Sequence, residues 1–170
     1  GFDDDIRREL AEAMRHDGVD LRFGVNVTAI EELEAGFRAT LTDGSTLETD
    51  VVLYATGRRP LTQGLGLEHA GVALNDAGAI MVNGDYQTSV PSIYAVGDVT
   101  DRVNLTPVAL AEGMAFARNT WAGLQTEVDY EFIPTAVFSQ PTIGTVGFTE
   151  AEARERFGDV RVFRSRFTPL

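Results

Sequence analysis

The sequence contains no cysteine among its 170 residues. These residues therefore supply no disulfide, thiolate nucleophile or zinc-thiolate site, and we expect no metal site in the chain. Long apolar runs are also missing, since none approaches the roughly 18 residues that a membrane-spanning helix needs. Because the first residues lack the basic and apolar regions of a secretory signal, the sequence predicts a cytoplasmic protein without a membrane partner.

The sequence also lacks clusters of basic residues. The chain has 14 basic against 26 acidic residues and a formal net charge of -12. No Lys/Arg cluster interrupts this acidity as contact with a phosphate backbone would require, so nucleic acid is not expected as a partner. The hydrophobic content of 44% favours a folded globular chain.

Helix and strand patterns alternate in the first part of the chain. Residues 3–17 have apolar side chains at helical spacing, acidic residues at the start and Gly18 after the end. Strand patterns follow at residues 19–23, in a hairpin with an Asp-Gly turn at 43–44, and at 51–57. The last of these is a continuous apolar run that predicts a strand covered on both faces. This order predicts the later half of an α/β nucleotide-binding domain.

Two further groups of elements follow. After the break at residues 57–60, strands are predicted at 78–83 and 92–97, and a helix at 106–123 with Pro107 at its first position. We expect this helix to bury one face, formed by Leu110, Met114, Ala117 and Trp121. A strand-turn-strand and a last helix are then predicted, with Thr149 and Glu152 as a capping box and Gly158 as the stop.

The stretch "SIYAVGDVTDRVNLTPVAL" places Asp98 at the carboxyl end of an apolar strand. Open α/β sheets bind ligands there, and a carboxylate can accept hydrogen bonds from the hydroxyl groups of a polyol. The alternative is that Asp98 only caps a turn, because Gly-Asp is common in turns. The dipeptide alone does not decide between these interpretations.

A helix start eight residues later adds a second element to this stretch. Backbone N–H groups at residues 106–108 and the positive end of the helix dipole would stabilise negative charge on a ligand. Phosphate sites usually include a glycine-rich loop, which "VTDRVNL" lacks. A flavin fits better, because its reduction places negative charge on the pyrimidine edge of the ring. The polyol beside Asp98 would then be the ribityl chain.

Three segments resemble those of the pyridine nucleotide-disulfide oxidoreductases, in that family's order. "SIYAVGDV" with "NLTPVALAEGMAFA" is similar to their second flavin-binding segment, "VVLYATGRRP" to the end of their nucleotide domain, and "PTAVFSQPTIGTVGFTEAEA" to the start of their interface domain. The resemblance implies an α/β chain with the end of a Rossmann-like NADPH domain (1–60), the return segment of an FAD domain (61–128) and the start of an α+β dimerisation domain (129–170).

The resemblance also implies roles for single residues. Asp98 would hold a ribityl hydroxyl of FAD, and the backbone of Thr106 would meet the flavin pyrimidine edge. Gly57 would let the backbone lie close to NADPH. Asn104 and Ala136 match positions that approach the nicotinamide through backbone atoms. No catalytic residue is expected in this chain, because the redox cysteines would precede it and the catalytic His would follow it.

Within the family, the sequence looks most like the glutathione reductases of bacteria and plants. This implies a homodimeric, NADPH-dependent FAD enzyme that reduces glutathione disulfide through an enzyme dithiol. One alternative is a sibling enzyme that reduces trypanothione, thioredoxin, lipoamide or mercuric ion, since Met114 stands where some relatives have an Arg that contacts glutathione. The other alternative is a catalytically inert truncated chain that acts at most as an interaction or dimerisation module.

The remaining titratable candidates have ordinary explanations. His16 would lie in the last turn of a helix, where it interacts favourably with the dipole, and His69 would lie in a solvated loop. Arg58 and Arg59 would either steer a nucleotide phosphate or be solvated, and the sequence does not separate these two roles.

Overall fold

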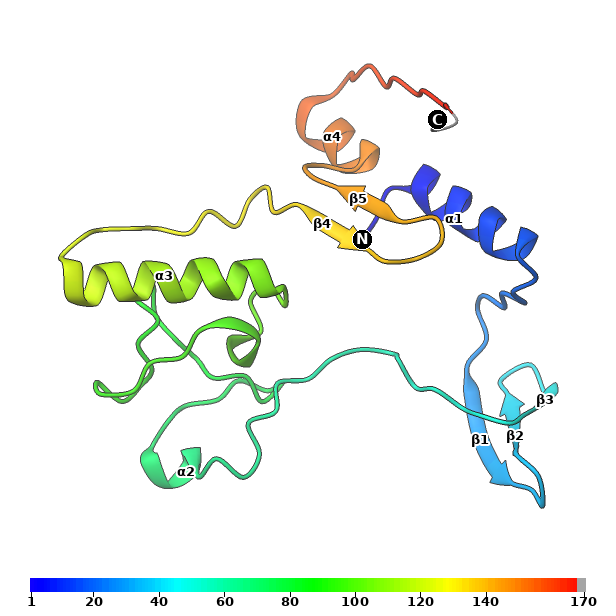
Figure 1. Cartoon of the computed structure of the whole chain (residues 1–170), viewed down its shortest axis with the longest axis horizontal. Helices are drawn as coiled ribbons and strands as arrows, with labels where there is room; N and C mark the ends of the chain where they lie inside the picture. Colours follow the sequence, from blue (N-terminus) through cyan, green and yellow to red (C-terminus); the bar gives the residue numbers. More distant parts are fainter. Residues whose placement is uncertain (168–170) are drawn as a thin grey trace. The chain divides into compact units, whose positions relative to one another are not determined.

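The computed structural model describes residues 1–167, which form two compact units. Unit 1 combines residues 1–54 with residues 131–167, and unit 2 comprises residues 55–130. Helices and short strands are mixed along the chain (Figure 1), which confirms the predicted α/β class. Among residues 1–167, no helix is both long and apolar enough to cross a membrane.

Unit 1 begins with helix α1 (Asp4–His16), as predicted. Asp3 is its N-cap, and its side chain accepts a hydrogen bond from the backbone N–H of Asp5 at 2.9 Å. Acidic residues in the first turn and basic residues in the last turn both complement the helix dipole. Gly18 follows the helix with a φ of +89°, which a glycine adopts readily.

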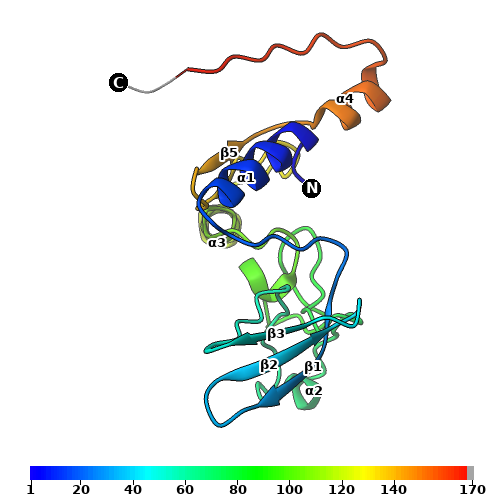
Figure 2. The ribbon, with the colours of Figure 1, turned by 90° about the vertical axis from the view of Figure 1, so that its right-hand side faces the viewer.

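The next part of unit 1 is an antiparallel meander of β1 (Val27–Glu32), β2 (Phe37–Leu41) and β3 (Thr46–Thr49) (Figure 2). The predicted Asp-Gly turn joins β2 to β3, and the Asp43 carboxylate accepts a hydrogen bond from the Ser45 backbone at 2.9 Å. Ala39 and Leu41 are buried on β2. The local turn chemistry therefore produced the hairpin that the sequence predicts.

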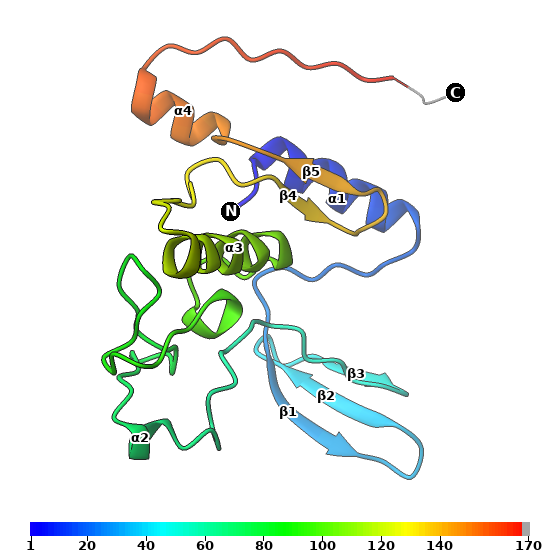
Figure 3. The same cartoon turned by 60° about the vertical axis from the view of Figure 1, so that its left-hand side comes forward.

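The last part of unit 1 contains the short hairpin of β4 (Thr135–Val137) and β5 (Ile143–Thr145), followed by α4 (Glu150–Phe157) (Figure 3). The predicted capping box is present, because the Thr149 side chain accepts from the Glu152 N–H and the Glu152 carboxylate accepts from the Thr149 N–H. Gly158 ends the helix with a φ of +77°.

Unit 2 contains the short helix α2 (Leu67–Ala70), the 3-10 turn η1 (Gly97–Thr100) and the long helix α3 (Thr106–Ala122), with loops between them (Figure 1). The turn η1 packs against α3. The core consists of apolar side chains from α2, the loops and η1, namely Val72, Ile80, Ala95, Leu67, Val82, Val90, Ile93 and Val99.

Four predicted strands do not form. Residues 19–23 and 51–57 pair with no strand, and residues 78–83 and 92–97 make only the isolated bridges Leu74–Ile80 and Gln87–Tyr94. The apolar run at 51–57 is not covered, since the side chains of Val51 and Leu53 are 74% and 85% exposed. A strand needs a neighbouring backbone to hydrogen-bond with, and no described segment supplies one for residues 51–57.

Two details of the helices also differ from the predictions. The buried residues of α3 are Val108, Glu112 and Ala115, whereas Leu110 and Trp121 are 66% and 75% exposed. The predicted buried face is therefore wrong, because η1 packs against the other side of the helix. His69 lies in α2 and not in a loop, although its side chain is exposed as expected.

Candidate functional site

Asp98 lies in η1, directly after Gly97, in a turn that is held on both sides. The Thr100 hydroxyl donates to the Gly97 carbonyl at 2.8 Å, and the Asp101 N–H donates to the Asp98 carbonyl at 3.1 Å. The Asp98 side chain is 53% exposed, so its carboxylate can be reached from solvent. The structure thus combines both sequence interpretations, because Asp98 belongs to a turn and still presents its carboxylate.

Gly97 cannot readily be replaced in this turn. Its φ of +73° is in the left-handed region, and a Cβ built on it would lie 2.9 Å from the Cβ of Ala109 on α3. Such a distance is shorter than carbon atoms tolerate. The close approach of the turn to α3 therefore explains why a glycine precedes Asp98.

Arg58 is the charged partner of Asp98. Its Nη1 atom lies 3.9 Å from Asp98 Oδ2, and the same nitrogen donates to the backbone carbonyl of Asn104 at 3.4 Å. One guanidinium thus brings together Asp98, the backbone of Asn104 and the segment that contains Gly57. The sequence did not separate two roles for Arg58, phosphate steering and solvation. The structure shows a third role, an ion pair with Asp98.

Thr106 is the first residue of α3 and Pro107 is the second, so Pro107 stands one position later in the helix than the sequence predicts. The N-cap is Leu105, whose side chain offers no oxygen to the helix start, and the first turn contains no acidic residue. Pro107 has no N–H, and the Val108 N–H donates to Leu105 O at 3.0 Å. The expected set of free donors is therefore smaller than predicted, since among residues 1–167 only the Thr106 N–H of these three positions lacks an acceptor.

Asn104 and Gly57 also lie in unit 2, on loops. The Asn104 side-chain nitrogen donates to Asp101 Oδ1 at 2.7 Å, whereas its Oδ1 atom is buried without a hydrogen-bond partner in the described chain. Buried polar atoms are rarely unpaired, so this oxygen points to an absent donor. Gly57 has a φ of +151°, a conformation that residues with side chains rarely adopt.

Ala136 belongs to unit 1. It lies on β4, is exposed, and pairs with Gly144 on β5. A shallow pocket of the hairpin is lined by Pro134, Thr135, Ala136, Gly144, Thr145 and Val146. Ala136 and its partner Gly144 are both exposed, and neither has a side chain larger than a methyl group.

Glu112 is a residue of the site that the sequence analysis missed. It is 1% exposed and accepts two hydrogen bonds, from the Gly97 N–H at 2.6 Å and from the Tyr130 hydroxyl at 2.7 Å. Tyr130 in turn accepts from Arg102 Nη1 at 3.5 Å. No local pattern marks Glu112 as buried, because a glutamate in a helix is normally solvated.

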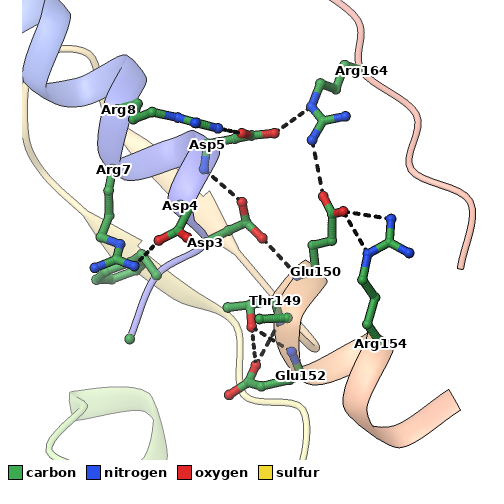
Figure 4. Close-up of a pocket in the computed structure, with 13 residues that line it drawn as sticks. Asp3, Asp4, Asp5, Arg7, Arg8, Thr149, Glu150, Glu152, Arg154 and Arg164 are labelled. Carbon is green, nitrogen blue, oxygen red and sulfur yellow. Dashed lines mark hydrogen bonds and ion pairs between the residues drawn. The ribbon is translucent and has the colours of Figure 1, made fainter. Parts of the chain in front are cut away.

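A larger pocket in unit 1 lies between the starts of α1 and α4 (Figure 4). Asp3 Oδ2 accepts a hydrogen bond from the Glu150 N–H at 2.8 Å, and this bond together with that from Asp5 lowers the pKa of Asp3. Hydrogen bonds from Arg164 and Arg8 lower the pKa of Asp5. The carboxylates of this pocket thus cap helices and bind arginines, which is a structural role.

The chain is similar to known proteins along its whole length. Residues 1–113 match the family model of pyridine nucleotide-disulphide oxidoreductases, and residues 133–170 match the model of their dimerisation domain. The glutathione reductase of Burkholderia cepacia is 48% identical over 100% of this chain and 38% of its own length. The trypanothione reductase of Trypanosoma congolense is 43% identical over 100% of this chain and 35% of its own length.

The chain is also similar to solved structures. An HOCl-induced flavoprotein disulfide reductase from Escherichia coli superposes with a TM-score of 0.84 and 32% identity, covering 90% of this chain and 35% of that one. The chain spans 38% and 40% of the length of the first two relatives that it matches. The family predicted from the three sequence segments is confirmed by the matching model over residues 1–113. The chain belongs to the pyridine nucleotide-disulphide oxidoreductase family.

Proposed function

We propose that this chain is part of a homodimeric, NADPH-dependent FAD enzyme that reduces glutathione disulfide to glutathione. The observation that carries the proposal is the 48% identity, over the whole chain, to the glutathione reductase of Burkholderia cepacia. Because the chain has no cysteine, the dithiol that exchanges with the substrate would come from outside it. A cytoplasmic location stays a prediction.

The proposed division into domains follows the sequence. Residues 1–60 would end the NADPH domain, residues 61–128 would return to the FAD domain, and residues 129–170 would begin the dimerisation domain. The match of residues 133–170 to a dimerisation-domain model supports the last assignment and the homodimer.

The residues around Asp98 suit a bound FAD. The exposed carboxylate of Asp98 would accept a hydrogen bond from a ribityl hydroxyl, and the unpaired N–H of Thr106 would donate to the pyrimidine edge of the flavin. The start of α3 would also stabilise negative charge on that edge. Bound FAD would supply electron transfer between a nicotinamide and a disulfide. The protein residues contribute binding, orientation and electrostatics.

Three further positions are proposed to approach NADPH. Gly57 has a backbone conformation that favours glycine, Asn104 carries the unpaired buried oxygen, and Ala136 lies on an accessible hairpin. The features of Gly57 and Ala136 support contacts made through backbone atoms, and Asn104 adds a side-chain oxygen that can accept a hydrogen bond. They do not depend on the charge of any of the three residues.

The proposal is tested with the protein expressed from its complete reading frame. We expect purified protein to retain flavin and to oxidise NADPH when glutathione disulfide is added. The variant D98N should weaken FAD binding by about tenfold, because it removes a charged acceptor. The variant D76N, which removes a carboxylate from an exposed residue of the same unit, should bind FAD normally. Protein without flavin, or without disulfide-dependent NADPH oxidation, would contradict the proposal.

The full-length protein tests one alternative, and the isolated 170-residue chain tests the other. A sibling reductase is favoured by the 43% identity to a trypanothione reductase, and a higher kcat/KM for trypanothione disulfide, thioredoxin, lipoamide or mercuric ion than for glutathione disulfide would support it. The other alternative is that the 170-residue chain by itself is inert. Its visible spectrum decides this, since stoichiometric flavin in the isolated chain would contradict an inert module.

A further inference from the structure

Glu112 is the largest fully buried side chain of the described residues, and no step of the proposed function uses it. Burying a carboxylate is costly unless hydrogen bonds replace its hydration. Each oxygen of Glu112 has one such bond, with Oε2 accepting from the Gly97 N–H and Oε1 accepting from the Tyr130 hydroxyl. A residue kept at this cost needs an explanation beyond packing.

The position of Glu112 connects the two residues proposed to hold the flavin. The Gly97 N–H belongs to the turn that carries Asp98, and Glu112 belongs to the helix that begins at Thr106. Ala109, three residues before Glu112, makes the close approach to Gly97 described above. The close approach of Gly97 to Ala109 and the hydrogen bond from Gly97 to Glu112 thus both hold the turn against the same face of α3.

The second hydrogen bond holds Glu112 in position. The Tyr130 hydroxyl donates to Glu112 and accepts from Arg102, whose other terminal nitrogen donates to the Asn83 carbonyl at 2.9 Å. The carboxylate therefore cannot rotate away from Gly97 without losing the hydrogen bond from the Tyr130 hydroxyl. The orientation of the Glu112 side chain is set by residues that lie outside the turn.

We propose that Glu112 is a positioning residue for FAD, which sets the Asp98 turn against the start of α3 through its hydrogen bond to the Gly97 N–H. Tyr130 supports it by occupying the other oxygen. This inference depends on the proposed function, because it concerns the binding of the same flavin. It adds a residue that touches neither the flavin nor the nicotinamide.

The test measures the dissociation constant of FAD and the visible circular dichroism of the flavin in the full-length protein. E112A should raise the dissociation constant at least about tenfold, because the Gly97 N–H and the Tyr130 O–H both lose their acceptor. E112Q should remain within about threefold of the wild type and keep its dichroism, because an amide oxygen can still accept from Gly97.

A matched variant separates positioning from general stability. Ala115 is buried on the same face of α3 but makes no hydrogen bond to the turn, and A115G should lower the Tm without weakening FAD binding. Equal loss of FAD in A115G and E112A would overturn the inference, and so would an E112Q variant no better than E112A. Unchanged FAD binding in E112A would overturn it as well.

A second variant tests the inference even if E112A does not fold. Y130F keeps the Gly97 bond but removes the donor to Oε1, so we expect a weaker FAD affinity by about threefold or more. Y94F removes a hydroxyl of the same unit whose hydrogen-bond partner within residues 1–167 is Gln87, and it should not change the FAD affinity. Equal affinities in Y130F and Y94F would overturn the inference. Wild-type protein without flavin would instead overturn the proposed function.

Discussion

Asp3 and Glu150 join the starts of two helices that lie 147 residues apart in the sequence. Asp3 accepts from the backbone of its own helix and from the first residue of α4, so one carboxylate satisfies donors at both helix starts. This contact holds the first and last described helices of unit 1 together.

The pKa of Asp3 should depend on the backbone N–H of residue 150. E150P should raise the pKa of Asp3, because proline at the first helical position is tolerated but has no N–H to donate. E150A removes the side chain and keeps the N–H, so it should leave the pKa of Asp3 low. The carboxyl carbon shift of Asp3 against pH measures both, with a wild-type midpoint below 3.8 expected.

The sign of the stability change follows from the lowered pKa. The Asp3 bonds stabilise the folded state above pH 3.8, and this contribution is lost as the pH falls through the lower pKa of the folded protein. E150P should therefore weaken the acid dependence of unfolding in comparison with E150A. An identical Asp3 midpoint in the two variants would argue against the contact.

Replacement of the α4 cap should destabilise unit 1. T149A removes the hydroxyl that accepts from the Glu152 N–H and should lower the free energy of unfolding by about 1 kcal/mol. T149S keeps a hydroxyl at the same position and should recover most of this loss. Chemical denaturation of the two variants makes the comparison, and a T149S variant as unstable as T149A would show that the methyl group is what matters.

Gly97 should tolerate alanine poorly. G97A would combine a positive φ with a Cβ 2.9 Å from Ala109, and we expect it to cost at least about 1 kcal/mol of stability. Gly84 is the matched control, since a Cβ there meets nothing within 4 Å, and G84A should change stability by less than about 0.5 kcal/mol. Similar thermal denaturation curves for the two variants would contradict the close approach.

Tyr130 should make stability depend on alkaline pH. Burial, followed by its hydrogen bond to Glu112, raises the pKa of Tyr130 well above its usual value of about 10. The raised pKa stabilises the folded state fully below pH 10, and this contribution is lost as the pH rises toward the pKa of the folded protein. Y130F should lose the alkaline component of unfolding, whereas Y94F should retain it. Denaturant unfolding between about pH 9 and pH 11 provides the measurement.

Local chemistry explains which parts of the fold the sequence predicted. The capping box at Thr149 and the Asp-Gly turn at 43–44 depend on residues within a few positions of each other, and both are present in the structure. The run at 51–57 has the composition of a buried strand, but a strand forms only where another backbone segment supplies hydrogen bonds. The composition of residues 51–57 does not reveal whether a neighbouring segment is present to hydrogen-bond with them.

In the candidate site, too, only residues with a local sequence pattern could be predicted. The sequence pointed to Asp98 and to the helix start at Thr106, because each has its own local signature. It missed Glu112, since a glutamate in a helix is normally read as solvated. The buried side of α3 was set by how Gly97 packs against Ala109, and this close approach has no signature in either segment alone.

The hydrogen bond from Tyr130 to Glu112 has a practical consequence for dividing this protein into pieces. A truncation at the predicted boundary, after residue 128, would remove the hydroxyl that Oε1 of a buried carboxylate depends on. An independently expressed piece that ends two residues later keeps this donor. Tyr130 should therefore be treated as the closing residue of unit 2 when its boundaries are chosen for expression.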